Sequence, residues 1–164
     1  NMDHGSFILH IDAATHLPAD YLEQVYARFE KNKKLVCLGG QFVFYDGTTW
    51  ISLVRFFNHW MLWLFAVLVS FGKIGPMGNN MTFKKLAYDK TSGFQVDLKY
   101  GEDMDLCRKL SRVGKVKLDM SLQCPTSVRR FVFNKHLFVL GVNFIKMCAT
   151  GKPYKNVLPH SKDL

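Results

Sequence analysis

The stretch Phe7–Asp12, which reads Phe-Ile-Leu-His-Ile-Asp, decides the architecture of this chain. An apolar run that ends in an acidic residue is typical of a buried strand with a polar group at its carboxyl-terminal tip. Residues 17–34 follow; they open with Leu-Pro, carry apolar residues at helical spacing and end in basic residues, which predicts a helix. Residues 35–45 are again strand-like, except at Gly39-Gly40, where we expect a bend or a close backbone approach. This strand–helix–strand order predicts an α/β fold.

The alternation of elements continues along the chain. Residues 80–83 resemble a short strand, residues 102–114 carry apolar residues at helical spacing and end in glycine, and residues 115–119 alternate as a strand does. The family resemblance described below implies that these elements form a mixed sheet flanked by helices, in one domain over residues 1–130. A C-terminal amphipathic helix and a basic tail are expected over residues 131–164.

Two stretches are unusually apolar for a soluble α/β domain. Residues 50–71 are rich in Trp and Phe, but their fully apolar part, residues 60–69, is too short to cross a bilayer. Residues 131–148 are apolar with basic residues interspersed, which favours an amphipathic helix over a membrane span. Residues 50–71 could lie in the membrane interface or pack against the sheet, and both interpretations stay open.

The charge distribution restricts the class of partner. The formal net charge is +9, and no acidic residue occurs between Asp46 and Asp89 or between Asp119 and Asp163. One-signed surfaces of this kind attract phosphates on nucleotides or lipid headgroups, although a plain solvated face remains an alternative. We find no helix-turn-helix, RNA-binding or zinc-finger pattern, so a nucleic-acid partner is not expected.

The 4 cysteines are far apart and include no Cys-x-x-Cys pair. This spacing argues against a disulfide framework or a cysteine metal site. We expect reduced thiols in a cytosolic protein. The first residues also lack the pattern of a signal peptide.

Four segments, taken in order, carry the chemistry. They are residues 12–15 (Asp-Ala-Ala-Thr), 78–85 (Gly-Asn-Asn-Met-Thr-Phe-Lys-Lys), 101–106 (Gly-Glu-Asp-Met-Asp-Leu) and 126–130 (Thr-Ser-Val-Arg-Arg). Their order and spacing resemble family-2 inverting glycosyltransferases of the GT-A (Rossmann-like) fold, over residues 7–130. The resemblance implies transfer of a sugar from a nucleotide-diphosphate donor. The Gln-x-x-Arg-Trp motif of processive members is absent from the sequence.

The resemblance also implies roles for individual residues. An inverting transfer needs a general base for the acceptor hydroxyl, and by position this is Asp103, with Glu102 beside it. Both lie in the first turn of the expected helix, where the helix dipole favours ionised carboxylates. The resemblance implies substrate contacts by Asp12, Gly78, Asn80, Arg129 and Arg130, and guanidinium groups suit phosphate. An ordinary helix terminus, turn and surface pair are the plain alternatives.

The sequence departs from the family pattern at the strand tip. The family's Asp-x-Asp motif holds the donor ribose and a divalent metal, but Ala14 replaces the second acid here. A methyl group offers no oxygen ligand to Mg²⁺ or Mn²⁺, so Asp12 is the only metal ligand that the motif supplies. Thr15 or His16 could substitute in part.

A second departure concerns the segment that precedes this strand in the family and builds the nucleotide pocket. Nothing in this sequence corresponds to it, so we expect an open sheet edge that a partner chain could complete. We predict a cytoplasmic glycosyltransferase-like protein that lies peripherally on the membrane, with the activity of the chain alone left open. The alternative is a non-catalytic, membrane-associated interaction module, either a degenerate or a split glycosyltransferase.

Overall fold

We describe the protein from a computed structural model. The structure describes residues 5–13, 15–46, 49–71, 73, 80–127 and 135–156.

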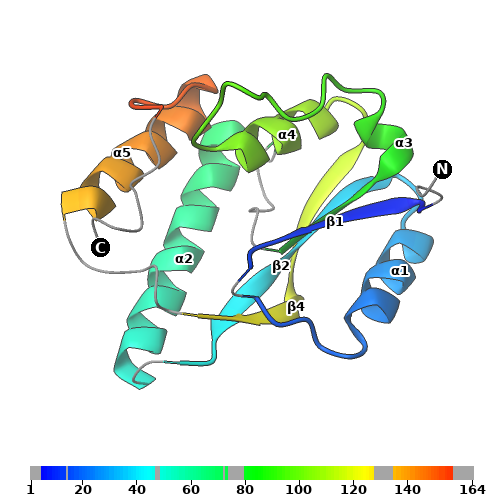
Figure 1. Cartoon of the computed structure of the whole chain (residues 1–164), viewed down its shortest axis with the longest axis horizontal. Helices are drawn as coiled ribbons and strands as arrows, with labels where there is room; N and C mark the ends of the chain where they lie inside the picture. The colour runs from blue at the N-terminus through cyan, green and yellow to red at the C-terminus, as the bar shows by residue number, and fades with distance from the viewer. Residues whose placement is uncertain are drawn as a thin grey trace.

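A four-stranded mixed sheet forms the centre of the molecule (Figure 1). The strands, in the spatial order β1-β3-β2-β4, are β1 (Phe7–Ile11), β3 (Asn80–Lys84), β2 (Leu35–Phe44) and β4 (Lys115–Thr126). β3 runs antiparallel to β1 and β2, whereas β4 runs parallel to β2. The carboxyl ends of β1, β2 and β4 therefore meet at one edge of the sheet. The predicted α/β class, with a mixed sheet flanked by helices, is confirmed.

Helix α1 (Tyr21–Lys31) covers one face of the sheet. Its buried residues Tyr21, Val25 and Phe29 recur every four positions and pack on residues of β2 and β4. The helix begins later than the Leu-Pro pair predicts, because the Tyr21 N–H donates to the Pro18 carbonyl at 3.0 Å in a turn before the helix. The proline therefore opens this turn and lies outside the helix.

Helices α3 (Lys85–Tyr88) and α4 (Glu102–Leu110) cover the opposite face. Leu106, Cys107 and Leu110 of α4 pack against Met81 and Phe83 of β3. The helix ends at Leu110, and a turn in which the Gly114 N–H donates to the Leu110 carbonyl at 3.0 Å completes the predicted segment. The burial of α4 against the sheet fixes the position of its first turn.

Helices α2 (Thr49–Ser70) and α5 (Lys135–Thr150) pack side by side (Figure 1). Their carboxyl-terminal halves meet the start of α4, where Ala66, Met104, Phe144 and Met147 form a buried cluster. Among the described residues, no helix is both long enough and apolar enough to cross a membrane. Ala66 is buried in this cluster while other apolar residues of α2 remain exposed, and the membrane interface stays a prediction for residues 50–71.

The Gly39-Gly40 pair marks a close backbone approach, as the sequence predicts. A Cβ atom on Gly40 would overlap the carbonyl oxygen of Leu122 and the side-chain amide of Asn80. At the same point the pairing of β2 with β4 slips, because Gly40 pairs with Asp119 and Gln41 pairs with Gln123. β4 therefore continues well past the predicted residues 115–119.

All four cysteines are free and buried, which confirms the absence of a disulfide framework. Burial raises the pKa of the Cys124 and Cys148 thiols to about 11. These two thiols are therefore protonated at neutral pH and are poor nucleophiles.

Candidate active site

The strand-tip motif and the Gly-Glu-Asp motif come together in the structure. Asp12 follows β1 at the edge where the parallel strands end, and Glu102 is the first residue of α4. The charges of Asp12 and His10 both act on the Glu102 carboxyl group, which places these residues near one another.

Burial dominates the electrostatics of Glu102. It raises the pKa of the Glu102 carboxyl above its ordinary value, and the neighbouring charges of Asp103 and Asp12 raise it further, against a lowering by His10. Desolvation of the half-buried carboxyl therefore acts against the ionisation that the helix dipole favours, and the ionised form expected for Glu102 stays a prediction.

The three acidic side chains of α4 have different environments. Asp105 pairs with Lys109 at 2.7 Å, one helical turn later. The Asp103 Oδ1 accepts a hydrogen bond from the Met104 N–H at 2.8 Å. The charges of Asp12 and His10 act on the Glu102 carboxyl, and Asp103 follows Glu102 directly in the chain.

Gly101 gives this pair its position. Its φ of 75° is in the left-handed region, which glycine adopts without the steric cost that a Cβ brings. A Cβ on Gly101 would also lie 3.0 Å from the Cγ of Met147 on α5. Both the backbone angle and the space therefore require glycine immediately before Glu102.

The loop after Asp12 is attached to the end of β4. The hydroxyl groups of Thr15 and Thr126 lie 3.3 Å apart, and the His16 N–H donates to the Pro125 carbonyl at 2.8 Å. The His16 ring contacts Tyr45 edge-on, with 4.9 Å between centroids. Thr15 and His16 are thus engaged with the ends of β2 and β4.

A divalent metal does not fit the described part of this site. Within it, no group of three or more His, Cys, Asp or Glu side chains is placed to hold one ion. Mg²⁺ requires several oxygen ligands in near-octahedral geometry, and Asp12 alone supplies too few. Ala14 lies outside the described residues, and metal binding by Asp12 stays a prediction.

Asn80 lies inside the protein. Its side chain is fully buried; its Oδ1 accepts a hydrogen bond from the Tyr21 hydroxyl, and its Nδ2 donates to the Leu122 carbonyl at 3.4 Å. Burial raises the pKa of Tyr21 to about 12, so the hydroxyl remains a donor. Asn80 thus joins α1, β3 and β4 at the end of the sheet where Asp12 lies. Its contact with a substrate stays a prediction. The other expected contacts, Gly78, Arg129 and Arg130, lie outside the described residues.

Two residues near the carboxylates are absent from the sequence-based site. Burial raises the pKa of Tyr100, and the charges of Asp103 and Glu102 add to this effect. His10 is on β1, the strand that leads to Asp12, and its ring centroid lies 5.6 Å from that of Phe94. In the sequence, Tyr100 is marked only by its place directly before the Gly-Glu-Asp motif. His10 is marked only as a single titratable residue in an apolar strand.

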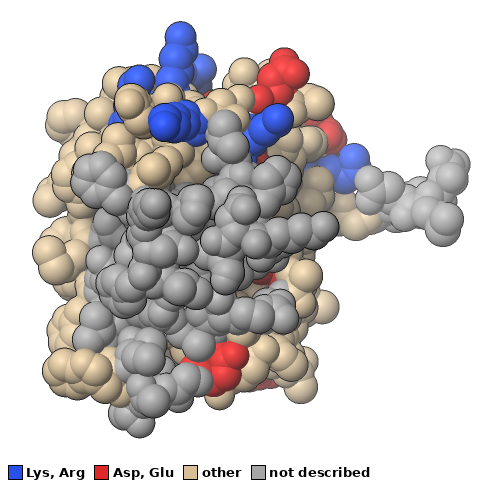
Figure 2. Space-filling view, turned by 60° about the vertical axis from the view of Figure 1, so that its left-hand side comes forward, with Lys and Arg blue, Asp and Glu red and all other residues tan. Residues whose placement is uncertain are grey.

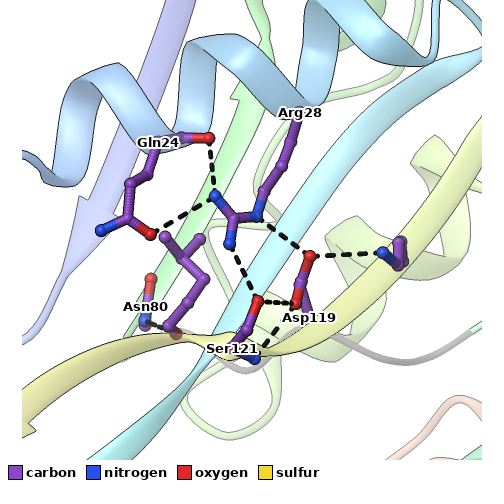
Figure 3. A network of polar contacts seen from close by, with 7 residues as sticks. Gln24, Arg28, Asn80, Asp119 and Ser121 are labelled. Carbon is purple, nitrogen blue, oxygen red and sulfur yellow. Dashed lines mark hydrogen bonds and ion pairs between the residues drawn. The ribbon is translucent and has the colours of Figure 1, made fainter.

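A hollow of about 500 Å³ lies at the opposite edge of the sheet, between α1 and β4. The Arg28 guanidinium donates there to Asp119 at 3.0 Å, to Ser121 at 2.9 Å and to the Gln24 carbonyl at 2.9 Å (Figure 3). Burial would raise the pKa of Asp119, but hydrogen bonds from Ser121, Arg28 and Lys117 hold it well below its usual range. This network joins α1 to the slipped part of β4, and we assign it a structural role.

Comparison with known protein families shows which family the chain belongs to. The family model described as Glycosyl transferase family group 2 matches residues 7–121, which is more than half of the chain. The chain belongs to this glycosyltransferase family. No curated protein matches the sequence.

The glycosyltransferase match includes both halves of the site. It begins at β1, contains Asp12, Glu102 and Asp103, and ends within β4. Helix α5 lies beyond the matched residues but packs on the start of α4. The carboxylates of this glycosyltransferase are therefore supported partly by a segment that the family match does not include.

Proposed function

We propose that this glycosyltransferase transfers a sugar from a nucleotide-diphosphate donor to an acceptor hydroxyl, with inversion, at the site formed by Asp12, Glu102 and Asp103. The proposal is supported by the family match, which includes Asp12, Glu102 and Asp103, and by the position of Asp12 after β1 and of Glu102 and Asp103 in the first turn of α4. Two half-buried carboxyl groups beside a third suit proton transfer and binding of sugar hydroxyls.

In the proposed mechanism, Asp103 accepts the proton of the acceptor hydroxyl. The acceptor oxygen bonds to the anomeric carbon from the face opposite the leaving group, and the bond from that carbon to the diphosphate oxygen breaks. Asp12 binds the donor side, and Glu102 hydrogen-bonds the acceptor or the sugar. Arg129 and Arg130 are the proposed phosphate ligands, by sequence alone. No step is assigned to Mg²⁺ or Mn²⁺, because the described residues do not form a ligand set.

Release of UDP or GDP from a panel of nucleotide sugars, with membrane lipids and free sugars as acceptors, tests the proposal. Loss of a general base costs about 10²- to 10⁴-fold in rate, so Asp103→Asn should lower kcat by that factor. Asp105→Asn is the matched control, because Asp105 is in the same helix but pairs with Lys109. Equal rates for wild type and Asp103→Asn would exclude Asp103 as the base.

A membrane surface is the second proposed partner. The alternative function, a non-catalytic, membrane-associated module, also requires this partner. Large apolar side chains at helical spacing remain exposed along α2, among them Leu53, Phe57, Met61, Leu64 and Leu68. Lys and Arg side chains gather at the top of the face shown in Figure 2, with Asp and Glu side chains beside them. Apolar side chains flanked by cations favour the interface of an anionic membrane. We propose a peripheral, cytoplasmic location.

Flotation with vesicles of neutral and anionic lipids tests the membrane proposal. Leu68→Ser should weaken binding to the anionic vesicles, because Leu68 is 66% exposed on α2. Leu86→Ser is the control, since Leu86 is 76% exposed on α3 and lies away from this line of residues. Absence of binding, or equal loss in both variants, would contradict a membrane-facing α2. Binding that persists in an inactive protein would favour the non-catalytic module.

A partner chain is the third proposal, at the edge of β1. Among the described strands, β1 pairs with β3 alone. Leu22 and Tyr26 of α1 are exposed, and the Tyr26 ring contacts Phe7 of β1, with 6.4 Å between centroids. A strand added here would also cover these side chains. Sedimentation of wild type and Tyr26→Ser with candidate partner proteins checks the proposal, and equal association by both would refute this position.

A further inference from the structure

Residues 151–156 fold back along α5 because of one buried side chain. Asn143 is fully buried in α5; its Nδ2 donates to the Lys155 carbonyl at 3.0 Å, and its Oδ1 accepts from the Lys155 N–H at 2.7 Å. Gly151, with a φ of 74°, reverses the chain after the helix. Because an unpaired buried amide is costly, these two bonds fix the path of the segment.

Asn156 connects the end of this segment to the loop before the carboxylates. Its Nδ2 donates to the Asp97 carbonyl at 2.6 Å, and its Oδ1 accepts from the Lys99 N–H at 2.6 Å. Both amide groups of the side chain are therefore used on one short stretch of backbone. Only Tyr100 and Gly101 separate this stretch from Glu102.

Helix α5 contacts α4 both near its start, through Met104, and in its last turn, through Arg108. Arg108 of α4 donates through one nitrogen to the carbonyls of Met147 at 3.0 Å and Cys148 at 2.9 Å. The Met147 carbonyl also accepts from the Gly151 N–H at 3.0 Å, so Arg108 is a second donor to it and supplies a partner for the Cys148 carbonyl in the last turn of α5. Met147 also fills the space above Gly101.

From these contacts we infer that α5 and residues 151–156, which we call the brace, position the Glu102–Asp103 pair for transfer. The inference rests on the proposed function. The brace holds the loop before Glu102 through Asn156, the start of α4 through Met147 and the last turn of α4 through Arg108. The carboxylates lie between these points. Asn143 and Asn156 are positioning residues, which act on the carboxylates through the backbone.

The test compares three variants of the full chain. Asn156→Ala removes both bonds to the loop, whereas Asn156→Asp keeps the acceptor for the Lys99 N–H and loses the donor to Asp97. Asn32→Ala is the matched control, because the Asn32 side chain also accepts from a backbone N–H, that of Lys34 at 3.2 Å, beyond the end of α1. Hydrogen–deuterium exchange by NMR reads the loop independently of activity.

We expect exchange at the Lys99 and Glu102 amides to be at least tenfold faster in Asn156→Ala, and partly restored in Asn156→Asp. Asn32→Ala should leave these amides unchanged. Transfer by Asn156→Ala should show a lower kcat with an unchanged KM for the donor, and Asn156→Asp should recover part of it. Unchanged exchange in Asn156→Ala, or faster exchange with an unchanged kcat, would overturn the proposal. If the wild type shows no transfer while exchange responds as expected, the proposed function fails and the brace is a structural element only.

Discussion

Gly101→Ala tests how the Gly-Glu-Asp motif is held. With a φ of 75°, Gly101 lies in the left-handed region, where a residue with a Cβ costs about 1–2 kcal/mol. The new Cβ would also lie 3.0 Å from the Cγ and 3.3 Å from the Cε of Met147. Met147 is flexible, so this contact adds at most about 1 kcal/mol. We expect the free energy of unfolding to fall by about 1–3 kcal/mol.

Gly141→Ala is the matched control, because it makes the same chemical change with the opposite expected sign. Gly141 lies within α5, and a Cβ there would meet no atom within 4 Å. Alanine in a helix is more favourable than glycine by about 0.5–1 kcal/mol, so this variant should be more stable. Urea denaturation of both variants and the wild type measures the difference. A Gly101→Ala protein as stable as the wild type, or destabilisation of both variants alike, would refute the reasoning.

Three further predictions concern Asp119, Tyr21 and Gly40. Folding lowers the pKa of Asp119, so the stabilisation that its carboxylate gives is present above about pH 4 and is lost as the pH falls toward the folded-state pKa. The urea midpoints at pH 7 and pH 3 should therefore differ less in Asp119→Asn than in the wild type. Tyr21→Phe leaves the buried Asn80 oxygen without its donor and should cost about 1–3 kcal/mol in urea denaturation. Gly40→Ala places a Cβ against the Leu122 carbonyl, and circular dichroism should show little folded protein. These predictions would be contradicted by a pH dependence in Asp119→Asn equal to that of the wild type, by unchanged stability of Tyr21→Phe, and by a native spectrum of Gly40→Ala.

Local patterns predict most of the elements of the fold. The apolar run of β1 and the helical spacing of apolar residues in α1 and α4 appear in the structure because each element buries one face on the sheet. The length of β4 could not be predicted. Its residues 120–126 include a proline and follow a slip in register that only the pairing with β2 shows.

The environment of the candidate site could not be predicted from the sequence. The burial that raises the Glu102 pKa depends on packing between distant elements. Packing of the same kind buries the Asn80 side chain against Tyr21, and its contact with a substrate stays a prediction. The role of Asn156 depends on a reversal of the chain after α5, which no local pattern shows.

Calorimetric titration of UDP and GDP into the purified chain tests the central claim, that Asp12 and the Glu102–Asp103 pair form one donor-binding transfer site. The titration is run with and without Mn²⁺ on the wild type, Asp12→Asn and Ala14→Asp. We expect the wild type to bind one of the two nucleotides, Asp12→Asn to weaken binding at least tenfold, and Ala14→Asp to add a dependence on Mn²⁺. No binding by the wild type, or equal binding by the wild type and Asp12→Asn, would contradict the account.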